Sequence, residues 1–287
     1  MPILLIIISC LTREAEGVLI KKYNGKHEKG GFIFTSIVSL FSMIFFLCMD
    51  LITDPNGIQI TLPLAVYGIL SGIAFATASL LTFIALGCGA YVLSKLILSY
   101  GILITIGYGL FTGETLSVFG WIGIALIAIS LYLVKDDSKE ETVKISKKWI
   151  ICIALSVVCA GVFSVLQRHQ QIEFSNLYDN EFMIITLGVS AVSLFFIGVL
   201  KDGKDLGYII KNGSPYAIGA GISNGTTNLL TLYLYTLAPV SFVSPMNAGL
   251  AMIVSFLISK FIFKEKFSKL QYLGVLLGAI AIVLFNL

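Results

Sequence analysis

Charged residues are scarce in this sequence. Asp, Glu, Lys and Arg make up 12% of its 287 residues, whereas 57% are hydrophobic, and the mean hydropathy is +0.96. Charged residues approach a quarter of an ordinary soluble domain, so this composition excludes one. It predicts an all-α integral membrane protein. The net charge of +3 is too small, and the lysines are too widely spread, for a nucleic-acid-binding surface.

Paired cysteines and catalytic motifs are also missing. None of the five cysteines belongs to a CxxC pair, which excludes a disulfide framework and a zinc site of the usual spacing. The metalloprotease pattern HExxH, clustered acid and histidine pairs, and the nucleotide-binding pattern GxxxxGK[ST] are absent. We therefore expect neither an enzyme nor a bound cofactor, and no direct use of nucleotide energy.

Long apolar runs are what the sequence has in quantity. A membrane-spanning helix needs about 20 apolar residues, and turn or charge signals separate ten runs of that kind. An alternative for residues 3–10, the core of a cleaved signal peptide, lacks a preceding basic residue and a following cleavage site. The ten predicted spans are 3–22, 31–52, 62–86, 90–111, 117–134, 148–168, 181–200, 214–236, 240–262 and 270–287.

The positions of Lys and Arg predict the orientation of these spans. Sixteen of the 19 lie in connections, or at the adjoining span ends, on one side of the predicted membrane, Arg168 lies on the other side, and Arg13 and Lys95 lie well within spans. Because cytoplasmic loops carry an excess of Lys and Arg, the Lys-rich connections are expected inside the cell and both termini outside.

Two segments of the chain repeat. A shift of 151 residues matches Glu114-x-x-Ser117 and the following Gly123 to Glu265-x-x-Ser268 and Gly274, and a shift of 149 matches 72–82 to 221–231. The repeat predicts two five-helix halves, residues 1–134 and 148–287, joined by a cytoplasmic linker, 135–147. Because five is odd, the halves have inverted orientations, and a substrate site is expected between them near the membrane midplane.

Ionisable side chains inside predicted spans are the strongest site signal. Arg13, Glu14 and Glu16 lie in the first span and Lys95 in the fourth, at a cost of roughly 2.5–3.5 kcal/mol each near a helix centre. Arg13 and Glu16 are three residues apart and can pair, which would leave Glu14 as the freer carboxylate. Alternatives are a structural charge network between spans 1 and 4, an interfacial Glu16, and a Lys95 that extends to the membrane surface.

Other polar side chains recur at helical spacing. Tyr91, Ser94 and Lys95 share one face, and span 8 carries a stripe at spacings of three and four. This stripe lines a cavity or bonds neighbouring helices. Gln167 and Arg168 either gate the outer mouth or form a solvated helix end. The span 8 stripe is Gly221, Asn224, Asn228, Thr231 and Tyr235, and Ser241, Ser244, Pro245 and Asn247 open span 9.

The arrangement resembles the drug/metabolite transporter superfamily, in which two five-span halves each carry a Gly-Glu or Lys-Glu pair before their last helix. The first half is similar to the small multidrug resistance branch, matched by Glu14, Gly17 and Lys22 and by Ala90-Tyr91. The resemblance implies that Glu14 binds substrate or protons and that Tyr91 lines the cavity. That branch has Trp where Ser94 stands here, and the repeat places Gly161 opposite Glu14.

The resemblance implies a secondary transporter, working as an exporter of a small polar metabolite or drug. It would act by alternating access in a bacterial-type plasma membrane, with protons or another ion for coupling. The alternative is a lipid-linked substrate flippase of the same fold. The expected partners are the substrate and the bilayer but no nucleic acid, and the protein would be a monomer or homodimer. The candidate substrate-binding residues are Arg13, Glu14, Tyr91, Ser94, Lys95, Asn224, Asn228 and Asn247, with Glu14 also the candidate coupling group.

Overall fold

The computed structural model describes residues 2–27, 30–53, 57–89, 91–113, 117–134, 146–237, 240–264 and 268–284, and in these ranges it contains helices and no strands. Most of the predicted linker, Ala90, Glu114 and Glu265 lie outside the described residues, as do the side chains of Ser241, Ser244 and Pro245. The helices are α1 (Pro2–Lys26), α2 (Gly31–Thr53), α3 (Leu62–Cys88), α4 (Tyr91–Ser99), α5 (Ile102–Phe111), α6 (Val118–Val134), α7 (Lys147–Glu173), α8 (Asp179–Asp202), the 3₁₀ turn η1 (Gly203–Asp205), α9 (Leu206–Leu237), α10 (Val240–Phe261) and α11 (Lys269–Leu284).

Five stretches of the described chain are long and apolar enough to cross a membrane. They are Gly31–Thr53, Leu62–Cys88, Tyr91–Phe111, Lys147–Glu173 and Asp179–Leu237, the last of which contains α8, η1 and α9. The helix α1 has the necessary length, but its charged residues lower its hydropathy. Helices α6 and α11 contain shorter apolar segments.

The predicted span 90–111 matches the apolar stretch Tyr91–Phe111, but it is not one continuous helix, because the chain divides there into α4 and α5. At Tyr100 and Gly101 the backbone N–H groups bond the carbonyls of Ile97 and Leu98, three residues back, so a tight turn replaces the α-helical pattern. The C-terminal end of α7 and the N-terminal end of α9 also extend several residues beyond the predicted spans.

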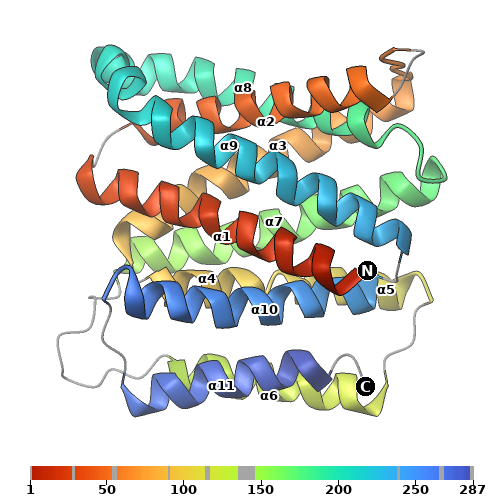
Figure 1. The fold of residues 1–287 in the computed structure, drawn as a ribbon, viewed down its shortest axis with the longest axis vertical. Helices are drawn as coiled ribbons and strands as arrows, with labels where there is room; N and C mark the ends of the chain where they lie inside the picture. The colour runs from red at the N-terminus through yellow and green to blue at the C-terminus, as the bar shows by residue number, and fades with distance from the viewer. Residues whose placement is uncertain are drawn as a thin grey trace.

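The helices lie side by side with their long axes in broadly one direction (Figure 1). Helix α1 packs against α9, α10 and α3, and α7 packs against α3, α4 and α5. Helix α2 packs against α8 and α9, while α8 also contacts α3. Helices α6 and α11 form a pair at one edge of the molecule, where α11 also contacts α10. The start of α1 and the end of α11 lie on the same side of the bundle in this view.

The distribution of side chains is the reverse of that in a soluble protein. Large apolar side chains such as Phe111, Leu200 and Leu62 are more than 80% exposed, whereas serines, threonines and amides are buried between helices. Water would make such an apolar exterior unfavourable, and hydrocarbon would make exposed hydroxyls and amides unfavourable. The outer surface is therefore suited to lipid.

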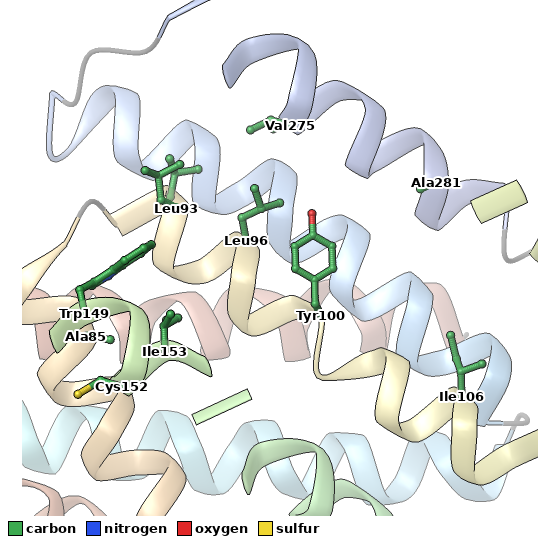
Figure 2. Close-up of a cluster of buried hydrophobic side chains, with 11 residues drawn as sticks. Ala85, Leu93, Leu96, Tyr100, Ile106, Trp149, Cys152, Ile153, Val275 and Ala281 are labelled. Carbon is green, nitrogen blue, oxygen red and sulfur yellow. The ribbon is translucent and has the colours of Figure 1, made fainter. Parts of the chain in front are cut away.

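An apolar cluster fixes the broken helix α4–α5 against its neighbours (Figure 2). Leu93, Leu96 and Tyr100 are buried in it together with Trp149 of α7 and Val275 of α11. The Tyr100 hydroxyl lies 3.1 Å from Ser130 Oγ of α6, and Ser130 donates to the Gly274 carbonyl of α11 at 2.7 Å. The helical turn at Gly274 therefore packs against another helix of the same chain. These hydrogen bonds join the pair α6–α11 to the junction between α4 and α5.

Candidate functional site

A polar cavity of about 270 Å³ lies between helices from both halves of the chain. Its walls come from α1, α3, α4, α5, α7, α9 and α10. The lining begins near the middle of α1 and extends toward the end of the bundle where α7 and α9 finish and α10 begins. The polar lining residues are Arg13, Glu14, Glu16, Lys95, Ser99, Thr105, Ser164, Gln167, Asn224, Thr227, Asn228, Thr231, Tyr235 and Asn247.

Glu14 and Lys95 form an ion pair that joins α1 to α4. Lys95 Nζ lies 3.4 Å from Glu14 Oε1, and Tyr91 Oη donates to Glu14 Oε2 at 2.7 Å. Lys95 also donates to the Arg13 carbonyl at 3.4 Å and lies 5.6 Å from the Tyr91 ring centroid. The structure therefore favours the charge network between spans 1 and 4 over a Lys95 that extends to the surface.

Gly17 leaves room for the two side chains of α4 that reach Glu14. A Cβ atom at this position would lie 2.5 Å from Lys95 Cε and Nζ, and 2.7 Å from Tyr91 Oη. A larger residue would require the end of the lysine side chain and the tyrosine hydroxyl to shift from their present positions beside Glu14. The Glu14 and Gly17 spacing noted in the sequence thus has a packing explanation.

The predicted pairing of Arg13 with Glu16 is wrong. The Glu16 carboxylate instead accepts from Asn224 Nδ2 of α9, at 3.1 Å to Oε1 and 3.2 Å to Oε2. Within the described chain the Arg13 guanidinium forms no ion pair or hydrogen bond, although it lines the cavity. A spacing of three residues permits pairing on an isolated helix, but here the amide of α9 binds the carboxylate. Glu14, expected to be the freer carboxylate, is the one in an ion pair.

The amides of α9 belong to a hydrogen-bonded chain that reaches α2 and α7. Ser42 of α2 donates to Asn224 Oδ1 at 3.2 Å, and Asn228 Nδ2 donates to the same oxygen at 3.0 Å. Gln167 Nε2 of α7 donates to Asn228 Oδ1 at 3.4 Å. Asn224 and Asn228 thus combine both suggested roles, since they bond neighbouring helices and line the cavity.

Two of the candidate residues do not line the cavity. Tyr91 is fully buried behind Glu14 and packs on Phe263, with ring centroids 5.0 Å apart. Ser94 Oγ accepts a hydrogen bond from Trp149 Nε1 of α7 at 3.0 Å. Tyr91 orients Glu14 and Ser94 joins α4 to α7, so direct contact of either side chain with a cavity ligand is not supported by the geometry.

Asn247 contributes a buried amide oxygen without a partner to the cavity wall. It lines the cavity from α10, is 4% exposed, and its Oδ1 atom has no hydrogen-bond partner in the described chain. A buried amide oxygen without a partner costs free energy, so a ligand or ordered water at this position would be favourable.

The sequence Gly221-Ile222-Ser223-Asn224-Gly225 has the spacing GxSxG that is found at hydrolase nucleophiles. That chemistry requires a sharp turn between a strand and a helix, which holds the serine in an exposed position. Here all five residues lie within the continuous helix α9. The match is therefore a coincidence of small residues on a packed helix.

Comparison with known proteins identifies the second half of the chain. Residues 147–287 match the sequence model of the EamA-like transporter family. This half belongs to the EamA-like transporter family. The resemblance to the drug/metabolite transporter superfamily is confirmed, and the protein is a membrane transporter of that type.

A solved crystal structure has a similar fold over almost the whole length. It is 15% identical, the match covers 96% of each chain, and the TM-score is 0.63. Among curated proteins, none matches the sequence. This likeness is one of fold alone, and it includes the first half of the chain, which the family match does not cover.

One residue of this EamA-like half lines the cavity although the sequence did not predict that it would. Gln167 was expected at the end of a span, but α7 continues to Glu173, and Gln167 is 2% exposed within the cavity wall. A signal was present, because Gln167, Gln170 and Gln171 are spaced three and four residues apart and so lie on one helical face. All three are buried.

Proposed function

We propose that the protein is a secondary transporter that moves a small polar metabolite by alternating access, with the central cavity as the substrate site. The observation that carries this proposal is the position of the cavity, between helices of both halves and lined by charged and amide side chains. A volume of about 270 Å³ corresponds to roughly nine water molecules at about 30 Å³ each, which suits a small metabolite.

We further propose ten membrane crossings in two inverted repeats, residues 1–134 and 148–287. Support comes from the pattern of helix contacts. In these repeats α1 would correspond to α7, α2 to α8, α3 to α9, α4–α5 to α10, and α6 to α11. When each helix is exchanged for its counterpart, the α1–α9 contact becomes the α7–α3 contact, and the α2–α9 contact becomes the α8–α3 contact. All four contacts are present. The contacts α2–α8, α6–α11 and α4–α10 map onto themselves. Such a pseudo-two-fold arrangement is typical of transporters with inverted repeats.

The proposed orientation places the Lys-rich ends in the cytoplasm of a bacterial-type cell, with the protein in its plasma membrane. The cavity then extends toward the outer side. At the cytoplasmic end α1 is joined to α9 by His27 Nδ1 and Tyr208 Oη, 2.7 Å apart, and by Lys26 Nζ donating to Tyr216 Oη at 3.2 Å. Export would require these contacts to separate so that substrate could enter from the cytoplasm.

The energy source in this proposal is an ion gradient, and Glu14 is the coupling group. Glu14 lines the cavity and is held by Lys95 and Tyr91, so a change in its protonation would break the link between α1 and α4. A helix contact that depends on one proton offers a physical connection between ion binding and helix movement. No catalytic step is part of this function.

A ligand screen with purified protein tests the proposal. Substrate that binds only the folded state raises the unfolding temperature, so a panel of amino acids, sugars, nucleobases and organic cations should include a compound that stabilises the protein. The same compound should exchange across proteoliposomes. Asn228→Leu should reduce both effects, whereas Glu173→Gln, at an exposed residue outside the cavity lining, should not. Stabilisation by lipid-linked headgroups alone would favour the flippase instead.

A further inference from the structure

Three polar side chains meet at the end of the bundle where α7 ends and α8 begins, outside the cavity lining. Each has a buried oxygen atom without a hydrogen-bond partner in the described chain: Gln170 Oε1, Gln171 Oε1 and Asp179 Oδ1. The side chains of Gln170 and Gln171 are almost completely buried, with 0% and 1% exposed. We propose that this cluster binds one hard monovalent cation, Na⁺, through the oxygens of the three side chains.

The direction of each glutamine amide is fixed by its donor group. Gln170 Nε2 donates to the Leu177 carbonyl at 2.8 Å. Gln171 Nε2 donates to the Leu232 carbonyl of α9 at 3.1 Å and to Asp179 Oδ2 at 3.3 Å. All these partners are acceptors, so a rotation that exchanged the amide nitrogen and oxygen would place oxygen against oxygen. The two Oε1 atoms are therefore acceptors that lack a donor.

Asp179 brings the two amides into one cluster and gives it a negative charge. The Gln171 amide bonds the Asp179 carboxylate, and the Gln170 amide also interacts with it. Among the residues that the structure describes, no Lys, Arg or His lies within ion-pair distance of Asp179. The cluster thus has more acceptors than donors and an uncompensated charge. Each buried oxygen without a partner is unfavourable, and one cation would compensate all three.

The two helix ends at this position leave that charge unchanged. Gln170 and Gln171 lie in the last turn of α7, where the free carbonyls carry partial negative charge, and Asp179 opens α8 at its positive end. These two partial charges have opposite signs and largely cancel. Lysine or arginine is often found in the last turn of a helix, but the last turn of α7 contains no basic residue. A single positive charge would therefore neutralise the cluster.

The ligand types indicate which cation fits. Carboxylate and amide oxygens, without His or Cys, are the ligands of hard cations and not of most transition metals. Ca²⁺ commonly binds several carboxylates, whereas only Asp179 supplies one to this cluster. Helix C-terminal ends and free carbonyls coordinate Na⁺ in several transporter folds. Na⁺ is therefore favoured over Ca²⁺.

A cation at this position would join three helices. Its proposed ligands belong to α7 and α8, and the Gln171 amide also bonds the Leu232 carbonyl of α9. Gln167, one turn before Gln171, and Thr231, next to Leu232, line the cavity. Bound Na⁺ would thus hold the α7 and α9 walls together at the end of the cavity that the proposed orientation places outside the cell. The site is separate from the cavity, so this inference does not depend on the transport proposal.

A salt titration of the purified protein tests the site. The unfolding temperature is measured in mixtures of NaCl and choline chloride at constant total chloride, so that the ionic strength does not change. Because only the folded cluster binds Na⁺, the unfolding temperature should rise by about 2–4 °C between zero and about 150 mM Na⁺ and approach a plateau. Asp179→Asn should lose this response. Glu173→Gln removes an exposed charge at the same end of α7 and should retain it.

The stability of Asp179→Asn without Na⁺ separates ion binding from helix packing. This variant removes a charge that has no counter-ion, so in choline chloride alone it should be at least as stable as the parent protein. A lower unfolding temperature in every salt mixture, with an unchanged Na⁺ response, would assign the cluster to packing and overturn the proposal. If Asp179→Asn does not fold, Asp179→Glu replaces it and should keep a Na⁺ response with about tenfold weaker affinity.

Other salts test the identity of the ion. Equal effects of NaCl and choline chloride on the parent protein would overturn the site. Stabilisation by CaCl₂ but not by NaCl, lost in Asp179→Asn, would overturn the assignment of Na⁺. Stabilisation by acid without any response to Na⁺ would show that Asp179 is compensated by a proton, which also overturns the proposal.

Discussion

At the scale of single residues, the main question is why a buried glutamate and lysine are kept in a membrane helix pair. Glu14 is 1% exposed, and its carboxylate has a cation and a phenol as partners. Removing one partner from such a group leaves the other without compensation, which costs more than replacing both by neutral side chains. The pair can therefore be tested for a structural role separately from a transport role.

Glu14→Gln should destabilise the protein by on the order of 3 kcal/mol, because Lys95 would remain without an anion. The double variant Glu14→Gln with Lys95→Met should recover most of this loss, as measured by thermal unfolding in detergent. If Glu14 is the coupling group, the double variant should fold but should not concentrate substrate in proteoliposomes. A folded double variant with normal concentrative transport would exclude the coupling role and leave the pair as a structural network.

Asn224→Leu and Asn228→Leu should each reduce transport more than they reduce the amount of folded protein. Interhelical polar contacts in membranes contribute on average well below 2 kcal/mol to stability, so the loss of either amide should be tolerated by the fold. Transport is measured per folded molecule, with Asn212→Leu as a control because the Asn212 side chain, within the described residues, donates only to the carbonyl of Tyr208 on its own helix. Unchanged transport in both variants would assign the amides to helix packing alone.

The sequence was sufficient to identify the polar residues but not the partners of each. Arg13, Glu14, Lys95, Asn224, Asn228 and Asn247 all line the cavity, as expected from ionisable and amide groups at membrane depth. Helical spacing shows which residues share a face of one helix. The contacts of Glu16 with Asn224 and of Ser94 with Trp149 depend on how separate helices are rotated against one another, which no local pattern specifies.

At the scale of helices, Gly17 of α1 provides the space that the Lys95 and Tyr91 side chains of α4 occupy. Gly17→Ala should displace the Lys95 ammonium and the Tyr91 hydroxyl from Glu14, since the new methyl group would lie 2.5–2.7 Å from both. The unfolding temperature should fall, and substrate binding with it. Gly25→Ala is a matched control on the same helix, where a Cβ would meet nothing within 4 Å. It should be neutral or stabilising by up to about 1 kcal/mol. Equal effects of the two substitutions would contradict this account of the contact.

The division of α4 from α5 shows what apolar periodicity cannot reveal about a helix. Residues 90–111 are apolar enough for one span, and the sequence alone gave no reason to break it. The break lies at Tyr100 and Gly101, where a Cβ on Gly101 would make only ordinary van der Waals contacts, 3.4 Å from the Leu98 carbonyl and 3.5 Å from the Val157 carbonyl of α7. The change of helix direction therefore comes from the tight turn, in which the two N–H groups bond carbonyls three residues back, and not from a lack of space for a side chain at position 101.

At the scale of the whole molecule, the weak internal repeat was more informative than any single motif. Two short matches in the same order predicted two halves, and the helix contacts are consistent with an exchange of these halves. In the proposed repeat the halves would differ in what they place at the centre, since Glu14 of α1 would correspond to Gly161 of α7. Gly161 is packed on Ile104, and a Cβ there would lie 2.5 Å from its Cδ1 atom. The proposed pseudo-symmetry thus leaves the charges of the cavity mainly on one side, a difference that overall symmetry cannot predict.

The orientation of the molecule gives the last prediction. Cysteines introduced at Lys204 and Gln59, both exposed, lie at opposite ends of the bundle according to the proposed topology. A membrane-impermeant maleimide added to intact cells should label Gln59→Cys and not Lys204→Cys, and the pattern should be reversed in inside-out vesicles. The parent protein, which contains the exposed native residue Cys48, serves as the control for labelling of native cysteines. The physical reason is the excess of lysine at one end of the bundle, because Lys-rich loops remain on the cytoplasmic side of the membrane. Labelling of Lys204→Cys from outside would invert the proposed orientation, so that the cavity would extend toward the cytoplasm. Labelling of both sites from both sides would show that the chain inserts in two orientations, for which the lysine bias alone would be insufficient.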